Sequence, residues 1–162
     1  LLSLAISGGA EHPPVYGLVA AACTSLPLGP GLRAYRLFAR AVDSLPDRGM
    51  WLTQRMLAAT IPEDNRGDFS AGGYALDIQD QTLRSLAALD VAAAVPRIQV
   101  PLWFVNGQYD QLRLNEPLFR RLAPQAELIV VPRTTHLLTA MRPRVFNAVL
   151  ALAIATIEER AA

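Results

Sequence analysis

Residues 101–136 decide the fold of this chain, and their sequence is PLWFVNGQYDQLRLNEPLFRRLAPQAELIVVPRTTH. An apolar run at 102–105 ends at a polar turn, and a second apolar run lies at 128–131. Between the two runs, residues 115–123 have the pattern of a helix, with Asn115 as its expected N-cap. Strand, helix and strand at this spacing predict parallel strands joined by a right-handed crossover.

Each of these two predicted strands is followed by a side chain of catalytic type. Asp110 comes three residues after Gly107, and His136 lies just beyond the second strand. Active sites of open parallel sheets collect at the carboxyl ends of the strands. The pair therefore suits the acid and base of a nucleophilic triad, in which the carboxylate fixes the imidazole tautomer and stabilises the imidazolium. Taken singly, an Asp after a strand is often only a turn former, and a lone His in a loop is usually only solvated.

The composition excludes some classes of function but does not identify one. At 162 residues, with 52% hydrophobic and 18% charged residues, the chain is one domain or part of a larger one, with enough apolar residues for a core. A net charge of +1 gives no reason to expect nucleic acid or an acidic membrane as a partner. Cys23 is the only cysteine, which predicts a reducing compartment and hence a cytoplasmic location. No apolar run is long enough to span a membrane.

The rest of the chain predicts one further strand and several helices. Residues 15–23 are a short apolar run bounded by turn signals, as expected for a strand buried on both faces. Helices are expected at 1–7, 32–42, 51–57, 76–89 and 144–159, and a polar loop at 62–73.

A family resemblance rests on the same residues. The pattern I-x-V-P-L-W-F-V-N-G-x-Y-D at 98–110, followed by L-I-V-V-P and by T-T-H at His136, resembles the C-terminal part of the α/β-hydrolase superfamily. Residues 86–98 resemble the return from that family's helical cap, and residues 1–19 are similar to its helix after the nucleophile and its sixth strand. The resemblance implies a partial α/β-hydrolase fold of class α/β, with a parallel sheet, helices on both faces and a helical cap insertion.

The resemblance also implies a division of the chain and roles for its residues. Residues 1–26 would be a core segment, 27–92 the cap and 93–162 the C-terminal core segment. Asp110 would be the triad acid after the seventh strand and His136 the base after the eighth. The nucleophile elbow G-x-S-x-G is absent from the 162 residues. We therefore expect a C-terminal fragment that starts just after the elbow and is inactive alone.

The implied activity is that of a serine-type hydrolase without a cofactor, acting on a small, apolar, ester-like molecule. Residues that bind this substrate are unknown, although aromatic and apolar side chains of the cap are candidates for pocket lining or for cap core. These are Tyr35, Phe38, Trp51, Met56, Phe69 and Tyr74. The expected partner is the missing N-terminal half of the fold, without which the first strand would have an open edge that self-associates.

Other side chains in the chain are weaker candidates for a nucleophile. Ser3 and Ser7 fall on a predicted helix and not at a strand-to-helix elbow. Cys23 ends a strand, where a single cysteine is usually a small buried hydrophobe. No motif surrounds the other three candidates, which are Ser25, Ser70 and Thr135. With His12 and His136 as the only histidines, no transition-metal site is expected.

Two rival hypotheses stay open on the sequence. The first is a non-catalytic, truncated member of the same fold that acts as a binding or interaction module. The second is an unrelated doubly wound domain, in which Asp110 and His136 would lie far apart.

Overall fold

The computed structural model describes residues 14–26, 28–71 and 79–161 of the chain. It divides into two units, one formed by Leu1–Leu26 with Val91–Ala162 and one formed by Pro27–Asp90. We call these the sheet unit and the helical unit, and each is described by itself.

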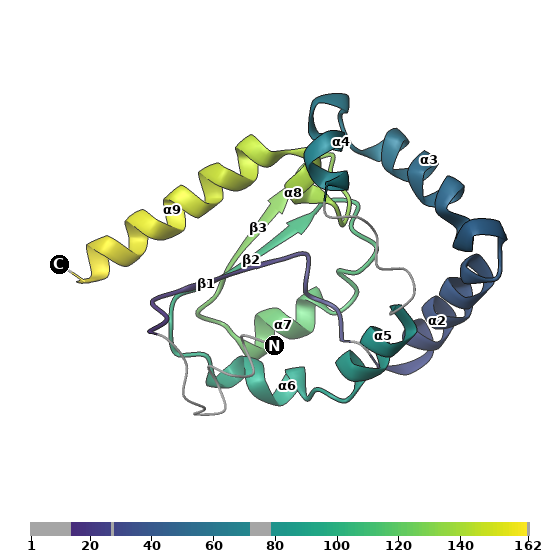
Figure 1. Ribbon diagram of the computed structural model, residues 1–162. Helices are drawn as coiled ribbons and strands as arrows, with labels where there is room; N and C mark the ends of the chain where they lie inside the picture. The colour runs from purple at the N-terminus through teal and green to yellow at the C-terminus, as the bar shows by residue number, and fades with distance from the viewer. Residues whose placement is uncertain (1–13, 27, 72–78, 162) are drawn as a thin grey trace. The chain divides into compact units, whose positions relative to one another are not determined.

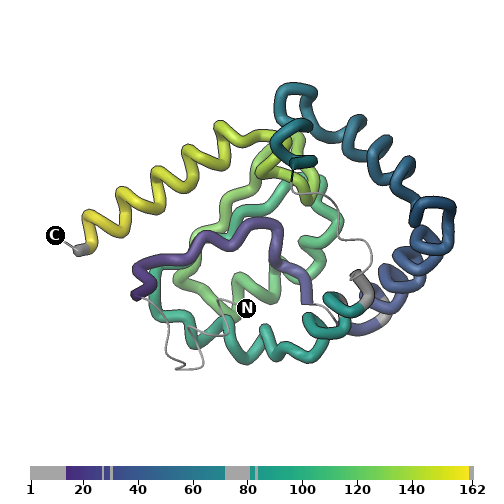
Figure 2. Tube along the Cα trace, viewed as in Figure 1, coloured from purple at the N-terminus to yellow at the C-terminus, as the bar shows by residue number. Residues whose placement is uncertain are grey.

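The sheet unit contains three parallel strands in the order β1-β2-β3. They are β1 (Leu18–Ala21), β2 (Leu102–Gly107) and β3 (Glu127–Val131). The predicted parallel pairing is confirmed, although β1 is shorter than the predicted strand at 15–23. Figure 2 shows the purple trace of β1 beside the green trace of β2, from which it is distant in sequence.

One face of the sheet is covered by helices that precede β2 in the sequence and by one that follows it. Leu102 and Phe104 point to this face and contact Phe119 of α7 (Glu116–Leu122). The rings of Phe104 and Phe119 meet edge to face, with centroids 5.6 Å apart. Further cover comes from α6 (Val91–Ala94) and from the short 3-10 helix η3 (Val95–Arg97).

The opposite face of the sheet packs on the C-terminal helices (Figure 1). Trp103 and Val105, which alternate with the residues of the first face, contact α8 (Leu138–Met141) and α9 (Pro143–Ala161). Every position of β2 is buried, as expected of a central parallel strand. Helices therefore lie on both faces of a parallel sheet, which confirms the predicted fold class.

The helical unit contains no strand among its described residues. Its elements are α2 (Gly29–Asp43), the 3-10 turn η1 (Pro46–Gly49), α3 (Met50–Thr60), α4 (Glu63–Ser70) and α5 (Gln79–Ala87). Helices were expected where α2, α3 and α5 lie, and the break between the first two falls at Pro46 because proline cannot continue a helix.

The expected loop at 62–73 is wrong where the structure describes it, because Glu63–Ser70 form α4. Pro62 precedes the helix, and Glu63 and Asp64 in its first turn suit the positive end of the helix dipole. Arg66 reaches back to α3 and donates to the carbonyl oxygens of Ile61 and Ala58 at 2.9 and 2.6 Å. The acidic first turn and the Arg66 hydrogen bonds therefore stabilise α4, although the helix has no apolar face.

Asn115 corrects a second expectation. It occupies the N-cap position of α7, but its side chain makes no capping hydrogen bond. Its Oδ1 instead accepts the N–H of Leu26 at 2.9 Å, and its own N–H donates to the carbonyl of Thr24 at 3.2 Å. Asn115 therefore joins the segment after β1 to α7.

Some expectations fall outside the described residues. These are the helix at 1–7 with Ser3 and Ser7, His12, Tyr74 and the start of the helix expected at 76–89. Among the helices of the described ranges, none has the length and apolar character needed to cross a membrane.

Candidate active site

Asp110 and His136 meet at the carboxyl edge of the sheet. Asp110 follows β2 and His136 follows β3, and these two strands are direct neighbours. His136 Nδ1 lies 3.3 Å from the Asp110 carboxylate oxygens. The Asp110 side chain is 1% exposed and that of His136 is 37% exposed. The buried carboxylate is thus paired with an imidazole that solvent can reach.

The loops that carry these two residues are held together by backbone hydrogen bonds. The N–H of Tyr109 donates to the carbonyl of Thr134 at 2.8 Å, and that of Gln108 donates to Val131 at 2.9 Å. In the opposite direction, the backbone N–H of Arg133 donates to the side-chain Oε1 of Gln108 at 3.0 Å. Three hydrogen bonds therefore join the segment that carries Asp110 to the segment that carries His136.

Gly107 permits this close approach. A Cβ atom at position 107 would lie 2.3 Å from the carbonyl oxygen of Thr135 and 2.7 Å from that of Thr134. These are backbone atoms, which cannot turn away as the end of a flexible side chain can. Only glycine lets the end of β2 pass so close to the loop that precedes His136.

The turn after Gly107 fixes the acid itself. The N–H of Asp110 donates to the carbonyl of Gly107 at 3.1 Å, and the N–H of Leu112 donates to Asp110 Oδ1 at 2.7 Å. The second bond is the local side-chain-to-backbone contact that favours Asp in turns. Asp110 is therefore both the turn former and the partner of His136.

The arrangement can act as an oriented base. When Nδ1 carries its proton toward the carboxylate, Nε2 has a free lone pair and can accept a proton. Asp110 would stabilise the imidazolium formed by that transfer. A carboxylate and an imidazole at this distance have the geometry that the acid and the base of a nucleophilic triad require.

A buried polar network lies behind this pair, and the sequence did not point to it. Asn106 Nδ2 donates to Thr24 Oγ1 at 2.8 Å and to Glu116 Oε2 at 2.7 Å. Arg113 forms an ion pair with the other Glu116 oxygen at 2.7 Å. Burial opposes ionisation of Glu116, but the hydrogen bonds from Arg113 and Asn106 outweigh it and lower the pKa of this carboxyl group.

Cys23 lies near the pair but is poorly suited to be a nucleophile. It follows β1 and retains some exposed surface, yet enough protein surrounds it that desolvation raises the pKa of its thiol to about 11. The negative charge of Asp110 adds to this rise. A thiol with such a pKa is protonated near neutral pH, and the thiolate is the reactive form.

The hydroxyl groups of two other candidates donate to a backbone carbonyl and to a thioether sulfur. Ser70 donates to the carbonyl of Arg66 at 2.6 Å, and Thr135 Oγ1 donates to the sulfur of Met141 at 3.3 Å. Thr135 also accepts the N–H of Leu137 at 3.4 Å, so it shapes the loop around His136. Within the described ranges, no group of three or more His, Cys, Asp or Glu residues could hold a metal ion.

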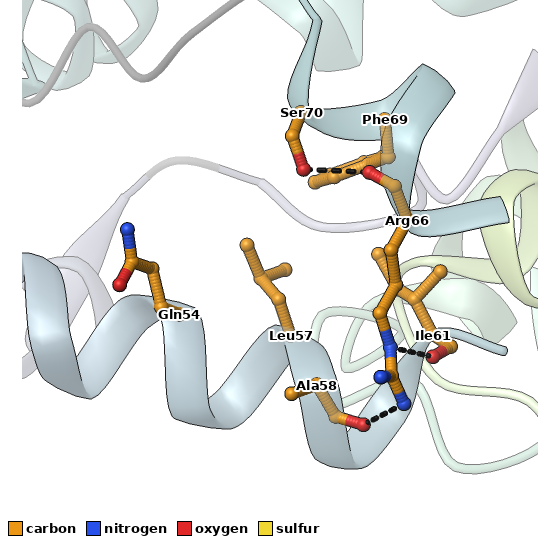
Figure 3. Close-up of a pocket in the computed structure, with 7 residues that line it drawn as sticks. All are labelled: Gln54, Leu57, Ala58, Ile61, Arg66, Phe69 and Ser70. Carbon is orange, nitrogen blue, oxygen red and sulfur yellow. Dashed lines mark hydrogen bonds between the residues drawn. The ribbon is translucent and has the colours of Figure 1, made fainter. Parts of the chain in front are cut away.

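The helical unit has a hollow of about 250 Å³ between α3 and α4 (Figure 3). Arg66 lies across it, with its guanidinium bound to the two carbonyls at the end of α3. Of the aromatic candidates, Phe69 lines this hollow, whereas Tyr35, Phe38, Trp51 and Met56 are exposed. The lining residues are Gln54, Leu57, Ala58, Ile61, Arg66, Phe69 and Ser70.

Comparison with known proteins identifies the fold. No family model matches the sequence, and no curated protein matches it. Solved structures do match. MenH from S. aureus has a TM-score of 0.64 at 14% identity, with 97% of this chain and 65% of that chain covered. The enol-lactonase from Burkholderia xenovorans LB400 has a TM-score of 0.60 at 14% identity, with coverages of 87% and 56%.

A thermophilic esterase from Thermogutta terrifontis gives a third match, with a TM-score of 0.57 at 16% identity and coverages of 88% and 56%. The chain therefore has part of the α/β-hydrolase fold, as the resemblance implied. It spans 56% of the length of the esterase and the lactonase and 65% of the length of MenH.

Proposed function

We propose that this chain supplies the acid and the base of a serine-type α/β-hydrolase, with Asp110 as acid and His136 as base. The observation that carries the proposal is the 3.3 Å approach of His136 Nδ1 to the buried Asp110 carboxylate at the ends of neighbouring parallel strands. The nucleophile would be a serine outside these 162 residues, since they contain no G-x-S-x-G.

In the proposed reaction, His136 Nε2 takes the proton of the serine hydroxyl as the oxygen attacks the ester carbonyl carbon. The imidazolium, stabilised by Asp110, then protonates the departing alcohol as the tetrahedral intermediate collapses to an acyl-enzyme. Water repeats the cycle through the same base and releases the acid. A small, apolar, ester-like substrate is part of the proposal, and the esterase and lactonase among the similar structures support an ester bond as the target.

The test uses the protein that contains this chain with all of its coding sequence, and a nitrophenyl ester as substrate. Replacing His136 by Ala is expected to lower kcat by about 10⁶-fold with the fold intact, because the general base is lost. Asp110→Asn should lower kcat by about 10⁴-fold through loss of the correct tautomer. Glu159→Ala, at an exposed position on α9, is the control and should leave kcat unchanged. Turnover that survives His136→Ala would contradict the proposal.

The absence of an elbow from these residues favours one rival, a non-catalytic binding or interaction module with the same fold. The two proposals differ in what a serine-reactive fluorophosphonate does to the same protein. The hydrolase would be labelled on one serine, and labelling would fall sharply in the His136→Ala variant. The module would not be labelled in either form.

Three further expectations belong to the same proposal. The helical unit would act as the cap over the substrate, the location would be cytoplasmic, and the sheet would be completed by the N-terminal half of the fold. Limited proteolysis with and without a substrate analogue would test the first, since a cap closed by ligand is cut more slowly.

A further inference from the structure

The strongest feature outside the acid-base pair is the polar network at the carboxyl end of β2. Asn106 is 0% exposed, and its amide donates to Thr24 Oγ1 and to Glu116 Oε2. Thr24 follows β1 and Glu116 begins α7. One buried amide group therefore connects the ends of two strands to the start of a helix.

Asn106 is a costly residue at this position. Its Oδ1 is buried and has no hydrogen-bond partner among the described residues. An unsatisfied buried acceptor costs about 1–3 kcal/mol. An apolar residue here would avoid that cost but would leave Thr24 Oγ1 and Glu116 Oε2 without this donor, so the amide and its two acceptors depend on one another.

The network extends into the turn that carries the acid. Arg113 lies three residues after Asp110, and its N–H donates to the carbonyl of Asp110 at 3.3 Å. Its guanidinium binds Glu116 at 2.7 Å and donates to the carbonyl of Gln108 at 3.2 Å. The Arg113 side chain thereby links the two ends of the turn from Gln108 to Arg113.

Glu116 is the residue that both sides of the network share. One carboxylate oxygen accepts from Asn106 at the end of β2, and the other accepts from Arg113 at the end of the turn. Its side chain is 13% exposed and that of Arg113 is 27% exposed, so solvent screens this pair less than it screens a surface ion pair. The lowered pKa keeps Glu116 ionised near neutral pH, as this bridging role requires.

We propose, resting on the proposed function, that Glu116 is a positioning residue for the Asp110–His136 pair. By binding Asn106 and Arg113 at once, it fixes the turn after β2 so that the Asp110 carboxylate stays within hydrogen-bonding distance of His136 Nδ1. Glu116 touches neither substrate nor the reacting atoms in this role.

The test uses the protein that contains this chain with all of its coding sequence, and the downfield NMR signal of the His136 Nδ1 proton. A proton hydrogen-bonded to a buried carboxylate exchanges slowly with water, so the rate of its exchange measures how firmly the pair is held. We expect Glu116→Gln to raise this rate about tenfold, because a neutral amide cannot replace two charge-assisted hydrogen bonds. The matched control is Glu127→Gln on β3, an exposed carboxylate that should leave the rate unchanged.

Two outcomes separate this inference from the proposed function. If Asp110→Asn leaves the His136 signal unaltered, the pair is not formed and the proposed function fails. If Asp110→Asn abolishes the signal but Glu116→Gln exchanges like the parent chain, the pair stands and the positioning role is overturned.

A second variant covers the case in which Glu116→Gln does not fold, as judged by far-UV circular dichroism. Arg113→Lys keeps the charge on a partly exposed side chain but loses the planar fork that contacts Glu116 and Gln108 together. It should raise the exchange rate severalfold in a folded chain. An unchanged rate in Arg113→Lys would overturn the inference equally.

Discussion

The two units of this chain bury their apolar residues to different extents. In the sheet unit, β2 is buried along its whole length and two apolar clusters cover its two faces. In the helical unit, α3 and α4 contain no buried residue, and Phe38, Trp51 and Met56 are more than half exposed at 56%, 55% and 57%. Two-sided burial fixes the strands firmly, whereas the helices depend more on turns, ends and single side-chain links.

The largest expected effect on the free energy of unfolding comes from a matched pair of phenylalanine truncations, one in each unit. Phe119→Ala removes a ring that is 1% exposed in the sheet unit and should lower the free energy of unfolding by about 3–5 kcal/mol. Phe38→Ala, in the helical unit, should cost less than about 1 kcal/mol. Urea unfolding followed by Trp103 fluorescence in a Trp51→Phe background would report on the sheet unit. Equal losses would contradict the contrast.

A pair of glycine substitutions sharpens the contrast with opposite signs. Gly107→Ala forces a Cβ against backbone oxygens and should destabilise the chain by about 1–3 kcal/mol while separating Asp110 from His136. Gly67→Ala lies inside α4 with nothing within 4 Å of the added Cβ, so it should stabilise the helix by up to about 1 kcal/mol. Thermal melts of both variants would show shifts in opposite directions, and a stabilising Gly107→Ala would be inconsistent with the geometry of the site.

The link between α3 and α4 predicts a smaller effect. Arg66→Met keeps an apolar stem but removes the hydrogen bonds to Ala58 and Ile61, at a cost of about 1 kcal/mol. The loss should appear as reduced helical signal in far-UV circular dichroism. Arg55→Met, an exposed position on α3, serves as the control. If both variants behave alike, the link does not stabilise α4.

The smallest expected effect is a pH dependence that belongs to Glu116. Its pKa in the folded chain is below the ordinary 4.5, so its ionised form contributes stability that is fully present above pH 4.5 and is lost as the pH falls through the lower, folded value. The stability difference between the parent chain and Glu116→Gln should therefore be constant above pH 4.5 and shrink in acid. Urea titrations at several pH values measure this difference, and a difference that stays constant into acid would contradict the role of the ionised Glu116.

The sheet unit could be predicted from the sequence because its signals are local. Apolar runs bounded by turns gave the strands, and the position of Asp110 and His136 just after two of them gave the candidate site. The helix α4 was missed because it is polar and contains a glycine, so it lacks the apolar periodicity by which helices are predicted.

The network around Glu116 was missed for a different reason. Asn106 and Thr24 are 82 residues apart, and neither residue type indicates a buried contact when taken alone. The one available signal was an amide at the end of an otherwise apolar strand, which requires partners once it is buried. Which partners it finds depends on tertiary structure.

The order of the strands along the chain has a consequence for synthesis. Ala20 of β1 pairs with Phe104 of β2, and the whole helical unit lies between them. At translation rates of 5–20 residues per second, roughly 80 residues separate the two strands by about 4–16 s on the ribosome. During that interval β1 lacks its β2 neighbour, so the edge of β1 that faces β2 stays unpaired until β2 has been synthesised.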